Sequence, residues 1–349
     1  MRTVDLRRDT ITLPTDEMRE RAFQAPLGDS VYGEDPVQNE LEELAARRLG
    51  MEAALFVPSG TMGNLAALLG HTTPGDEIIL EEHAHIRVSE TGGAAFVGGL
   101  MIRTVPSVLV QGTPTGAPDP AAVRAALRSE DIHYPRTGLI CLESPHHRHG
   151  GIVPPLSSFA EIRDIARERR IPVHLDGARI FNAAAFLGTD VREIAGYADS
   201  VMVALSKGLG APVGSVLCGP RDFINRAARF RKMLGGGMRQ TGWLCACGLV
   251  ALSEGNARML EQDNANARLL AERLAGLPGL EVSPERTHTN YVIARATGPL
   301  DAAEILDRLR EQGVLAARTG GAIRFVTSRQ VTREEVLYAA RQVAEVCGR

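Results

Sequence analysis

The stretch SVMVALSKGLGAPVG, residues 200–214, decides the fold of this 349-residue chain. It joins an apolar, β-branched run, typical of a buried strand, to a lysine between Ser206 and Gly208. The chain has 39 basic residues, of which only Lys207 and Lys232 are lysines. Arginine stays protonated, whereas lysine can lose its proton and act as a nucleophile. We therefore interpret Lys207 as a residue needed for its nitrogen chemistry; a surface lysine left at a strand end by chance is the alternative.

Short apolar runs and amphipathic runs alternate on both sides of this stretch. Strands are predicted at residues 53–58, 76–82, 138–144, 172–176 and 200–205. Helices are predicted between them, including one that Asp35 caps and Gly50 ends, and another over 155–170. This alternation predicts an α/β fold with a mostly parallel sheet sandwiched between helices.

The pattern changes after residue 250. A long helical stretch over roughly 252–274 is followed by shorter mixed segments up to the end of the chain. We therefore predict a large α/β domain with the N-terminal segment, residues 1–250, and a smaller C-terminal α+β domain, residues 251–349.

The bulk composition excludes several classes of protein. The net charge of −3 gives no sign of a nucleic-acid or anionic-membrane partner. No apolar run reaches the roughly 18 residues of a membrane helix, and the N-terminus lacks a secretory signal. Five cysteines without a paired framework suit a reducing compartment. We expect a cytoplasmic protein that binds a small molecule.

Distinctive residues follow four of the predicted strands. Ligands of an open α/β sheet bind outside the carboxyl ends of its strands. We therefore expect one cleft to be lined by the segments 59–61, 143–146, 176–179 and 206–208.

Asp176 and Lys207 together favour pyridoxal phosphate as a cofactor. A carboxylate beside the pyridine nitrogen keeps that nitrogen protonated, which makes the ring an electron sink. Asp176 alone would be weak evidence, because an Asp that opens a turn most often serves as a cap or turn-former. The segment Ser59–Thr61, before a predicted helix, offers a phosphate cradle, with a capped helix start as the alternative.

Three further features of the sequence are weaker evidence for a functional site. His85 could stack on a ring or transfer a proton, although a lone histidine is more often structural. The segment RKMLGGGMRQ, residues 231–240, could bring Lys232 and Arg239 to a phosphate or form a solvated loop. Cys245 and Cys247 lack a second ligand pair with zinc-site spacing, so we expect no metal.

Seven ordered motifs resemble those of the low-specificity L-threonine aldolases, and the resemblance extends over nearly the whole chain. They are VDLRRDT, GDSVYGEDP, LFVPSGTMGN, HLDGARIFNAA, LSKGLGAPVGSVL, RKMLGGGMRQ and IRFVTS. The resemblance implies the fold type I of pyridoxal-phosphate-dependent transferases. It also implies reversible retro-aldol cleavage of L-threonine or L-allo-threonine to glycine and an aldehyde, in a homotetramer, or at least a dimer, with shared sites.

The resemblance also implies a cofactor role for eight residues. Lys207 would form the Schiff base, Asp176 would pair with the pyridine nitrogen, and His85 would stack on the ring. The residues near the phosphate or the cofactor would be Gly60, Thr61, Arg179, and Lys232 and Arg239 from a neighbouring subunit.

For the substrate, the resemblance implies that Arg179 and Arg324 clamp the carboxylate, since the fork of arginine matches its two oxygens. His146 would approach the β-hydroxyl, and Tyr32 would lie near the site. His85 and His146 are the two candidates for the base that removes the hydroxyl proton.

Three departures from the family pattern lie by the expected substrate pocket. Arg8 stands where the family has a serine, ESPHH replaces ENTHN at 143–147, and Ser328 ends the late VTH motif. We therefore expect the chemistry to be retained and the preferred side chain or acceptor to differ. Arg8 either binds extra substrate charge or replaces the contact of the serine.

Other functions rank lower. A transaldolase that passes the glycine carbanion to another aldehyde comes second, followed by a β-eliminating lyase or an aminotransferase. A non-catalytic module that binds a phosphate ligand is disfavoured, because arginine would serve that purpose as well as lysine.

Overall fold

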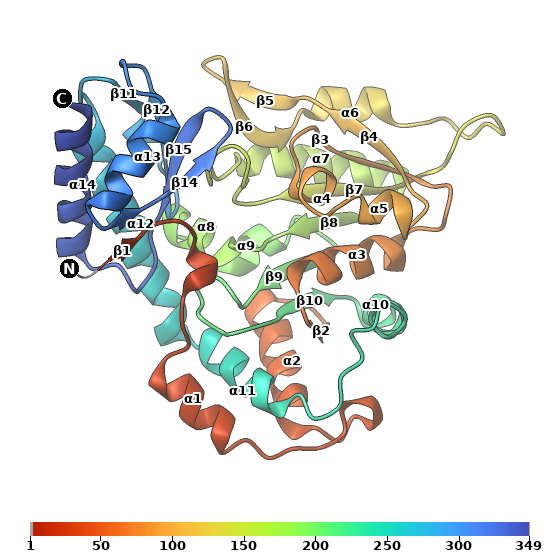
Figure 1. The fold of residues 1–349 in the computed structure, drawn as a ribbon. Helices are drawn as coiled ribbons and strands as arrows, with labels where there is room; N and C mark the ends of the chain where they lie inside the picture. Colours follow the sequence, from red (N-terminus) through yellow and green to blue (C-terminus); the bar gives the residue numbers. More distant parts are fainter. Residues whose placement is uncertain (1–2, 349) are drawn as a thin grey trace.

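The computed structural model describes residues 3–348 as an α/β protein built on a seven-stranded sheet (Figure 1). The strand order is β2 (Ala53–Val57), β10 (Ser215–Gly219), β9 (Ser200–Ala204), β8 (Val173–Asp176), β7 (Thr137–Glu143), β3 (Glu77–Glu81) and β4 (Met101–Val105). Within this sheet only β10 runs opposite to its neighbours. The predicted, mostly parallel α/β sheet is confirmed.

Strand residues alternate between two apolar layers, as the period of two requires. Leu55, Val57 and Met202 pack on one face, whereas Phe56 and Val203 pack on the other. The first face is covered by α3 (Gly60–His71) and α10 (Arg221–Met233). The second is covered by α2 (Pro36–Leu49), α7 (Leu156–Arg169), α8 (Ile180–Leu187), α9 (Val191–Ala195) and α11 (Gly242–Ala251).

The helix signals in the sequence are confirmed. The Asp35 side chain caps α2 by accepting from the backbone N–H of Gln38 at 3.0 Å. Gly50 ends that helix in the left-handed region, at φ 66°, where glycine carries no Cβ penalty. Helix α7 buries Phe159 and Ile162 as predicted.

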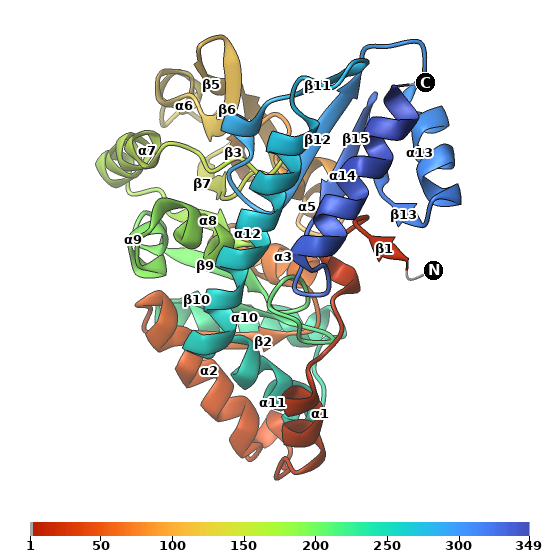
Figure 2. The same ribbon diagram turned by 90° about the vertical axis from the view of Figure 1, so that its left-hand side faces the viewer.

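A second core lies in the C-terminal part of the chain. Its antiparallel sheet has the order β11 (Leu280–Val282), β12 (Tyr291–Ala296), β15 (Ala322–Val326) and β14 (Ala317–Thr319), backed by α13 (Ala302–Glu311) and α14 (Arg333–Cys347). Helix α12 (Glu254–Leu274) contributes to both cores and runs between them in Figure 2.

The N-terminal segment lies against this second core. Strand β1 (Val4–Asp5) pairs in parallel with β13 (Val314–Leu315), and Val4 and Leu6 are buried there. The sequence grouped this segment with the large domain; the boundary at residue 250 itself stays a prediction.

The remaining elements are short. They are α1 (Asp16–Phe23), α4 (His85–Val88), α5 (Gly93–Phe96), α6 (Pro120–Ala126), the hairpin β5 (Ser107–Val110) and β6 (Thr113–Pro118), and 3-10 turns at Asp9–Ile11, Ser30–Tyr32 and Pro284–Arg286. Over residues 3–348, no helix combines the length and the hydropathy that crossing a membrane requires.

Candidate active site

The carboxyl ends of six strands meet at one edge of the large sheet, because β2, β3, β4, β7, β8 and β9 run in the same direction. Asp176 and Glu143 end two neighbouring strands and are paired in register. Lys207 follows β9, the strand next to that of Asp176. The four segments of the predicted cleft therefore follow strands whose carboxyl ends lie at this edge, and their sharing one cleft stays a prediction.

Lys207 has the properties of a nucleophile. Burial, together with the positive charge of Arg179, lowers its pKa from 10.5 to about 8, against the opposing charges of Asp176, Asp9 and Glu143. A substantial fraction of the amine is therefore neutral near pH 8, which an ordinary surface lysine would not achieve.

Asp176 is held in a buried network of hydrogen bonds. Its Oδ2 accepts from Nδ2 of Asn64 at 2.9 Å, and its Oδ1 accepts from the backbone N–H of Ala178 at 3.1 Å. Asn64 also donates to Oε1 of Glu90 at 2.7 Å and lies 3.1 Å from Nε2 of His174. These contacts fix the direction of the carboxylate.

His85 lies beside Asp176, as the predicted roles of both residues require. Its Nδ1 is 2.9 Å from Oε1 of Glu90 and 4.0 Å from Oδ2 of Asp176. Its backbone N–H donates to Oε2 of Glu143 at 2.7 Å. Burial lowers the pKa of the His85 imidazole, but Glu90, Asp176 and Glu143 together raise it above the ordinary value.

The N-terminus of α3 has free donors. Ser59 caps the helix by accepting from the N–H of Met62 at 3.2 Å. In the part of the chain that the structure describes, no group accepts from the backbone N–H of Gly60 or Thr61. Such a helix start attracts an anion. A phosphate group fits the donors that the sequence assigned to it.

Arg179 is engaged by a residue that the sequence did not single out. Its Nε and Nη2 donate to the two carboxylate oxygens of Asp9, at 2.6 and 2.7 Å. Asn290 donates to the same carboxylate at 3.1 Å. The Asp9 side chain is completely buried, and the Arg179 side chain is 10% exposed. Only Nη1 of Arg179 is left for a substrate, so its clamping role stays a prediction.

Arg324 of β15 has more free donors for a carboxylate than Arg179 has. It is 9 % exposed and forms no ion pair with any carboxylate of residues 3–348. Its Nε has no partner in that range, and its Nη2 makes only a long contact of 3.4 Å to the carbonyl of Arg7. A buried, unpaired guanidinium is costly unless an anion binds it.

A cavity of about 770 Å³ lies between the loop 147–150 and the C-terminal sheet. The side chains that matter for chemistry in its lining are His147, His149, Tyr291 and Arg324. Lys207 is not in this lining; it borders a separate, smaller pocket with Arg179.

The structure places His147, and not His146, at the cavity. The His146 side chain is completely buried, with Nε2 3.1 Å from Oε2 of Glu81. His147 turns to the other side, with Nδ1 3.1 Å from the Tyr291 hydroxyl and its ring 5.8 Å from that of His85. The predicted approach of His146 to the substrate therefore does not fit this arrangement.

The direction of the loop explains this correction. The backbone N–H of His146 donates to the carbonyl of Ile152, while that of His147 donates to Oε1 of Glu143 at 2.7 Å. The two side chains consequently leave the loop on opposite sides. Burial, followed by the charges of Arg179, His85, Arg324 and Lys207, lowers the pKa of His147 to about 2.

Four other predicted residues lie at the surface. Tyr32, Lys232 and Arg239 are exposed, and none of their described contacts reaches Lys207 or Asp176. Arg239 pairs with Asp29 at 3.1 Å. Arg8 is exposed too, but its charge contributes to lowering the pKa of Arg324.

Sequence reasoning missed Asp9, Asn64, His147 and Tyr291. Asp9 and Asn64 lie inside the matched motifs VDLRRDT and LFVPSGTMGN, which is the signal that could have identified them. The departure ESPHH marked His147 without assigning it a role, and no comparable signal marked Tyr291.

Comparisons with known proteins show the family to which the chain belongs. The model of the beta-eliminating lyase family matches residues 5–297. The chain is 44% identical to low-specificity L-threonine aldolase 1 of Arabidopsis thaliana over 97% of this chain and 94% of that protein. It is 42% identical to the low specificity L-threonine aldolase of Escherichia coli K12, over 97% of each.

A solved structure of Leishmania major threonine aldolase shares the fold. It matches with a TM-score of 0.82 at 20% identity, covering 99% of each chain. The chain therefore belongs to the beta-eliminating lyase family and, within it, to the low-specificity L-threonine aldolases.

Proposed function

We propose that this chain is a pyridoxal-phosphate-dependent aldolase that cleaves L-threonine, L-allo-threonine or a similar β-hydroxy-α-amino acid to glycine and an aldehyde. One observation carries the proposal: Lys207, with a pKa of about 8, follows the strand next to the one that Asp176 ends. The names of the Arabidopsis and E. coli relatives support the same reaction.

The residues at the sheet edge fit the cofactor. Lys207 supplies an amine for its aldehyde, Asp176 a fixed carboxylate for its pyridine nitrogen, and Gly60 and Thr61 free N–H groups for its phosphate. When bound, the cofactor accepts the electrons of the breaking Cα–Cβ bond.

Arg324 binds the substrate carboxylate. Its guanidinium is buried, unpaired among the described residues, and directed at the cavity. Nη1 of Arg179 adds a second donor. Arg8, which stands near Arg324, adds positive charge at the same end and favours a substrate with further negative or polar groups.

His147 takes the proton of the β-hydroxyl, and His85 is the second candidate. His147 is neutral at working pH because burial and the neighbouring cations hold its pKa near 2. A carboxylate bound at Arg324 compensates one of those cations, which raises the pKa of His147 towards the range useful for a base.

The exposed surface supports a homotetramer, or at least a dimer, of this chain. Trp243, Met233, Tyr32 and Val31 are large and between 47% and 75% exposed. Residues 30 and 239 are hydrogen-bonded, so these side chains come from adjoining segments. A second copy that covers them would bring Lys232 and Arg239 to a neighbouring site. A cytoplasmic location is part of this proposal.

A substrate panel tests the proposal. Protein loaded with pyridoxal phosphate is incubated with L-threonine, L-allo-threonine and L-β-phenylserine, with the D-enantiomers as controls, and the released aldehyde is measured. We expect aldehyde from at least one L-substrate and none with Lys207→Ala. Absence of aldehyde from all three L-substrates would refute the proposed function.

A further inference from the structure

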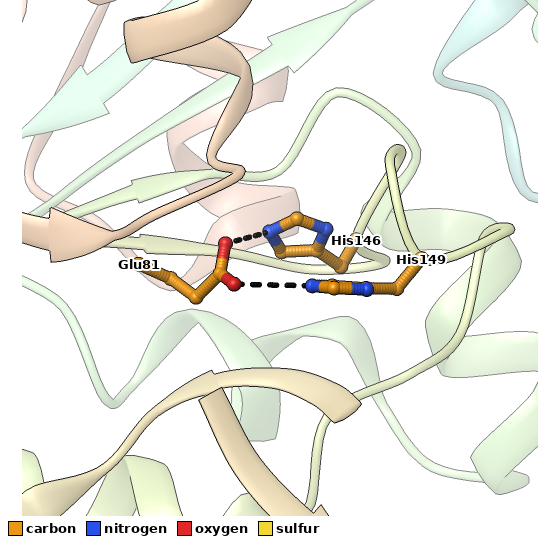
Figure 3. A group of neighbouring side chains, drawn as sticks. All are labelled: Glu81, His146 and His149. Atoms are coloured by element: carbon orange, nitrogen blue, oxygen red, sulfur yellow. Dashed lines mark hydrogen bonds and ion pairs between the residues drawn. The ribbon is translucent and has the colours of Figure 1, made fainter. Parts of the chain in front are cut away.

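A second cluster of chemically active side chains lies outside the Lys207 site. Glu81 ends β3, and His146 and His149 belong to the loop that follows β7. Figure 3 shows both imidazoles directed at the one carboxylate. Nε2 of His146 is 3.1 Å from Oε2, and Nε2 of His149 is 3.1 Å from Oε1. The three ligand atoms lie within 4.8 Å of one another.

These separations match those between ligands of one metal ion. Bonds of about 2.0–2.1 Å at tetrahedral angles leave an imidazole nitrogen and a carboxylate oxygen about 3.3 Å apart. Two such ligands point at the ion and not at each other. Nε2 of His146 shows this offset, because it lies close to Glu81 without the alignment of a hydrogen bond, whereas Nε2 of His149 makes a hydrogen bond of 3.1 Å with Oε1 of Glu81 that a bound ion would replace.

His146 is also the most isolated polar group of the cluster. Its side chain is 0% exposed, and neither ring nitrogen has a hydrogen-bond partner within residues 3–348. Buried polar groups of this kind normally have a partner. A bound ion would supply the partner that Nε2 lacks.

The charge at this position favours a cation. Glu81 is 2% exposed, and Glu143, itself buried, brings Oε2 to 3.6 Å from Nε2 of His146. Two buried carboxyl groups therefore face the His146 imidazole, and a divalent cation held there would balance their charge.

An ion could reach the cluster from the large cavity. His149 is 12% exposed and lines the cavity of about 770 Å³, whereas Glu81 and His146 lie behind it. A water molecule from the cavity can occupy a fourth position. Two imidazoles, one carboxylate and an open position form a donor set suited to zinc.

We propose that Glu81, His146 and His149 bind one divalent transition-metal ion of the zinc class. No metal was expected from the sequence, because Cys245 and Cys247 lack a second ligand pair with zinc-site spacing. Glu81 lies far from the two histidines along the chain, and the three form no spacing motif. The ion links Glu81 of β3 to His146 and His149, which lie before and after His147 in the loop. The proposal does not depend on the proposed aldolase reaction.

Zinc titration of the full chain, loaded with pyridoxal phosphate and freed of metal by a chelator, tests the proposal. Zn²⁺ is titrated against a chromophoric competitor, and bound metal is quantified by elemental analysis. We expect one equivalent in the wild type and at least about tenfold weaker binding in His149→Ala and in Glu81→Gln. His133→Ala is the matched control, since His133 is exposed and its hydrogen bonds and ion pair within residues 3–348 are all with Asp131; it should bind as the wild type does.

Two results would overturn the metal site. One is the absence of zinc binding by the wild type at micromolar concentrations, which would leave the cluster as a proton-mediated ion pair. The other is wild-type affinity in both ligand variants. Should those variants fail to fold, the Co²⁺-loaded wild type decides: a tetrahedral ligand-field spectrum supports the site, and its absence contradicts it.

Discussion

At the scale of single residues, the site depends on how neighbouring charges set the protonation of Lys207, His147 and Arg324. Lys207 is shifted towards its neutral form by burial and Arg179. His147 is kept neutral by burial and by the cations around it. Arg324 remains charged but has no anionic partner among residues 3–348. Lys207 can therefore attack, Arg324 can hold a carboxylate, and His147 can accept a proton once a carboxylate at Arg324 raises its pKa.

Covalent capture of pyridoxal phosphate by the apo-protein should follow the titration of Lys207. Because the neutral amine attacks, the rate should rise with pH and level off above about 8, well below the ordinary 10.5. Borohydride quenching at timed intervals, followed by mass spectrometry of the peptide that contains Lys207, measures it. A rate that still rises steeply at pH 10 would show an unperturbed lysine.

Replacing Arg324 should weaken the binding of the substrate carboxylate. Arg324→Gln is expected to lower kcat/KM about 10- to 100-fold, mainly through KM, because a hydrogen bond to a charged group contributes about 1.5–3 kcal/mol. Arg295→Gln is the matched control, since Arg295 lines the same cavity but is largely exposed. Equal effects of both variants on KM would exclude a specific carboxylate site at Arg324.

Removing the imidazole of His147 should slow the reaction itself. His147→Ala is expected to lower kcat about 10²- to 10⁴-fold if this residue takes the β-hydroxyl proton. His147→Asn restores the asparagine that the family motif has at this position. The activities of the two variants distinguish His147 from His85 as the residue that takes the proton. Full activity in both variants would assign the proton transfer to His85.

At the scale of elements, Asp9 connects three parts of the chain. It lies at the start of the 3-10 turn Asp9–Ile11, pairs with Arg179 just before α8, and accepts from Asn290 next to β12. Asp9→Asn should cost about 3–5 kcal/mol of unfolding free energy, because it leaves a buried guanidinium unpaired. Urea unfolding at pH 7 measures this loss; a change below about 1 kcal/mol would contradict it.

The same pair predicts an acid sensitivity. Burial raises the pKa of Asp9, but Arg179 and other partners outweigh burial and lower it from 3.8 to about 2. The ionised pair therefore stabilises the fold fully above about pH 4, and this contribution is lost as pH falls from about 4 to 2. Wild-type stability should fall more steeply over that window than the stability of Asp9→Asn; parallel curves would contradict this.

The sequence predicted these elements unevenly, for physical reasons. Strand β9 and the capped helix α2 follow from local patterns, so residues 200–204 and 36–49 could be identified in advance. The pairing of Val4 with Val314 depends on contacts between distant segments. The opposite directions of His146 and His147 depend on which backbone groups the loop binds. No local pattern encodes either feature.

At the scale of the whole molecule, the exposed apolar side chains of residues 31–32 and 233–243 predict self-association. Light scattering coupled to size-exclusion chromatography should give about 150 kDa, the mass of four chains of 37.5 kDa. Trp243→Glu should reduce this mass and weaken cofactor binding together. A wild-type protein that is monomeric and fully active would contradict an active site shared between subunits.

The central claim is that Lys207 and its neighbours support carbon–carbon cleavage. Its most direct test is the simultaneous quantification of glycine, acetaldehyde and ammonia from L-threonine or L-allo-threonine, with wild-type protein and Lys207→Ala. We predict equimolar glycine and acetaldehyde from the wild type, no ammonia, and no product from the variant. Ammonia with a keto acid in place of glycine, or full activity of Lys207→Ala, would contradict the claim.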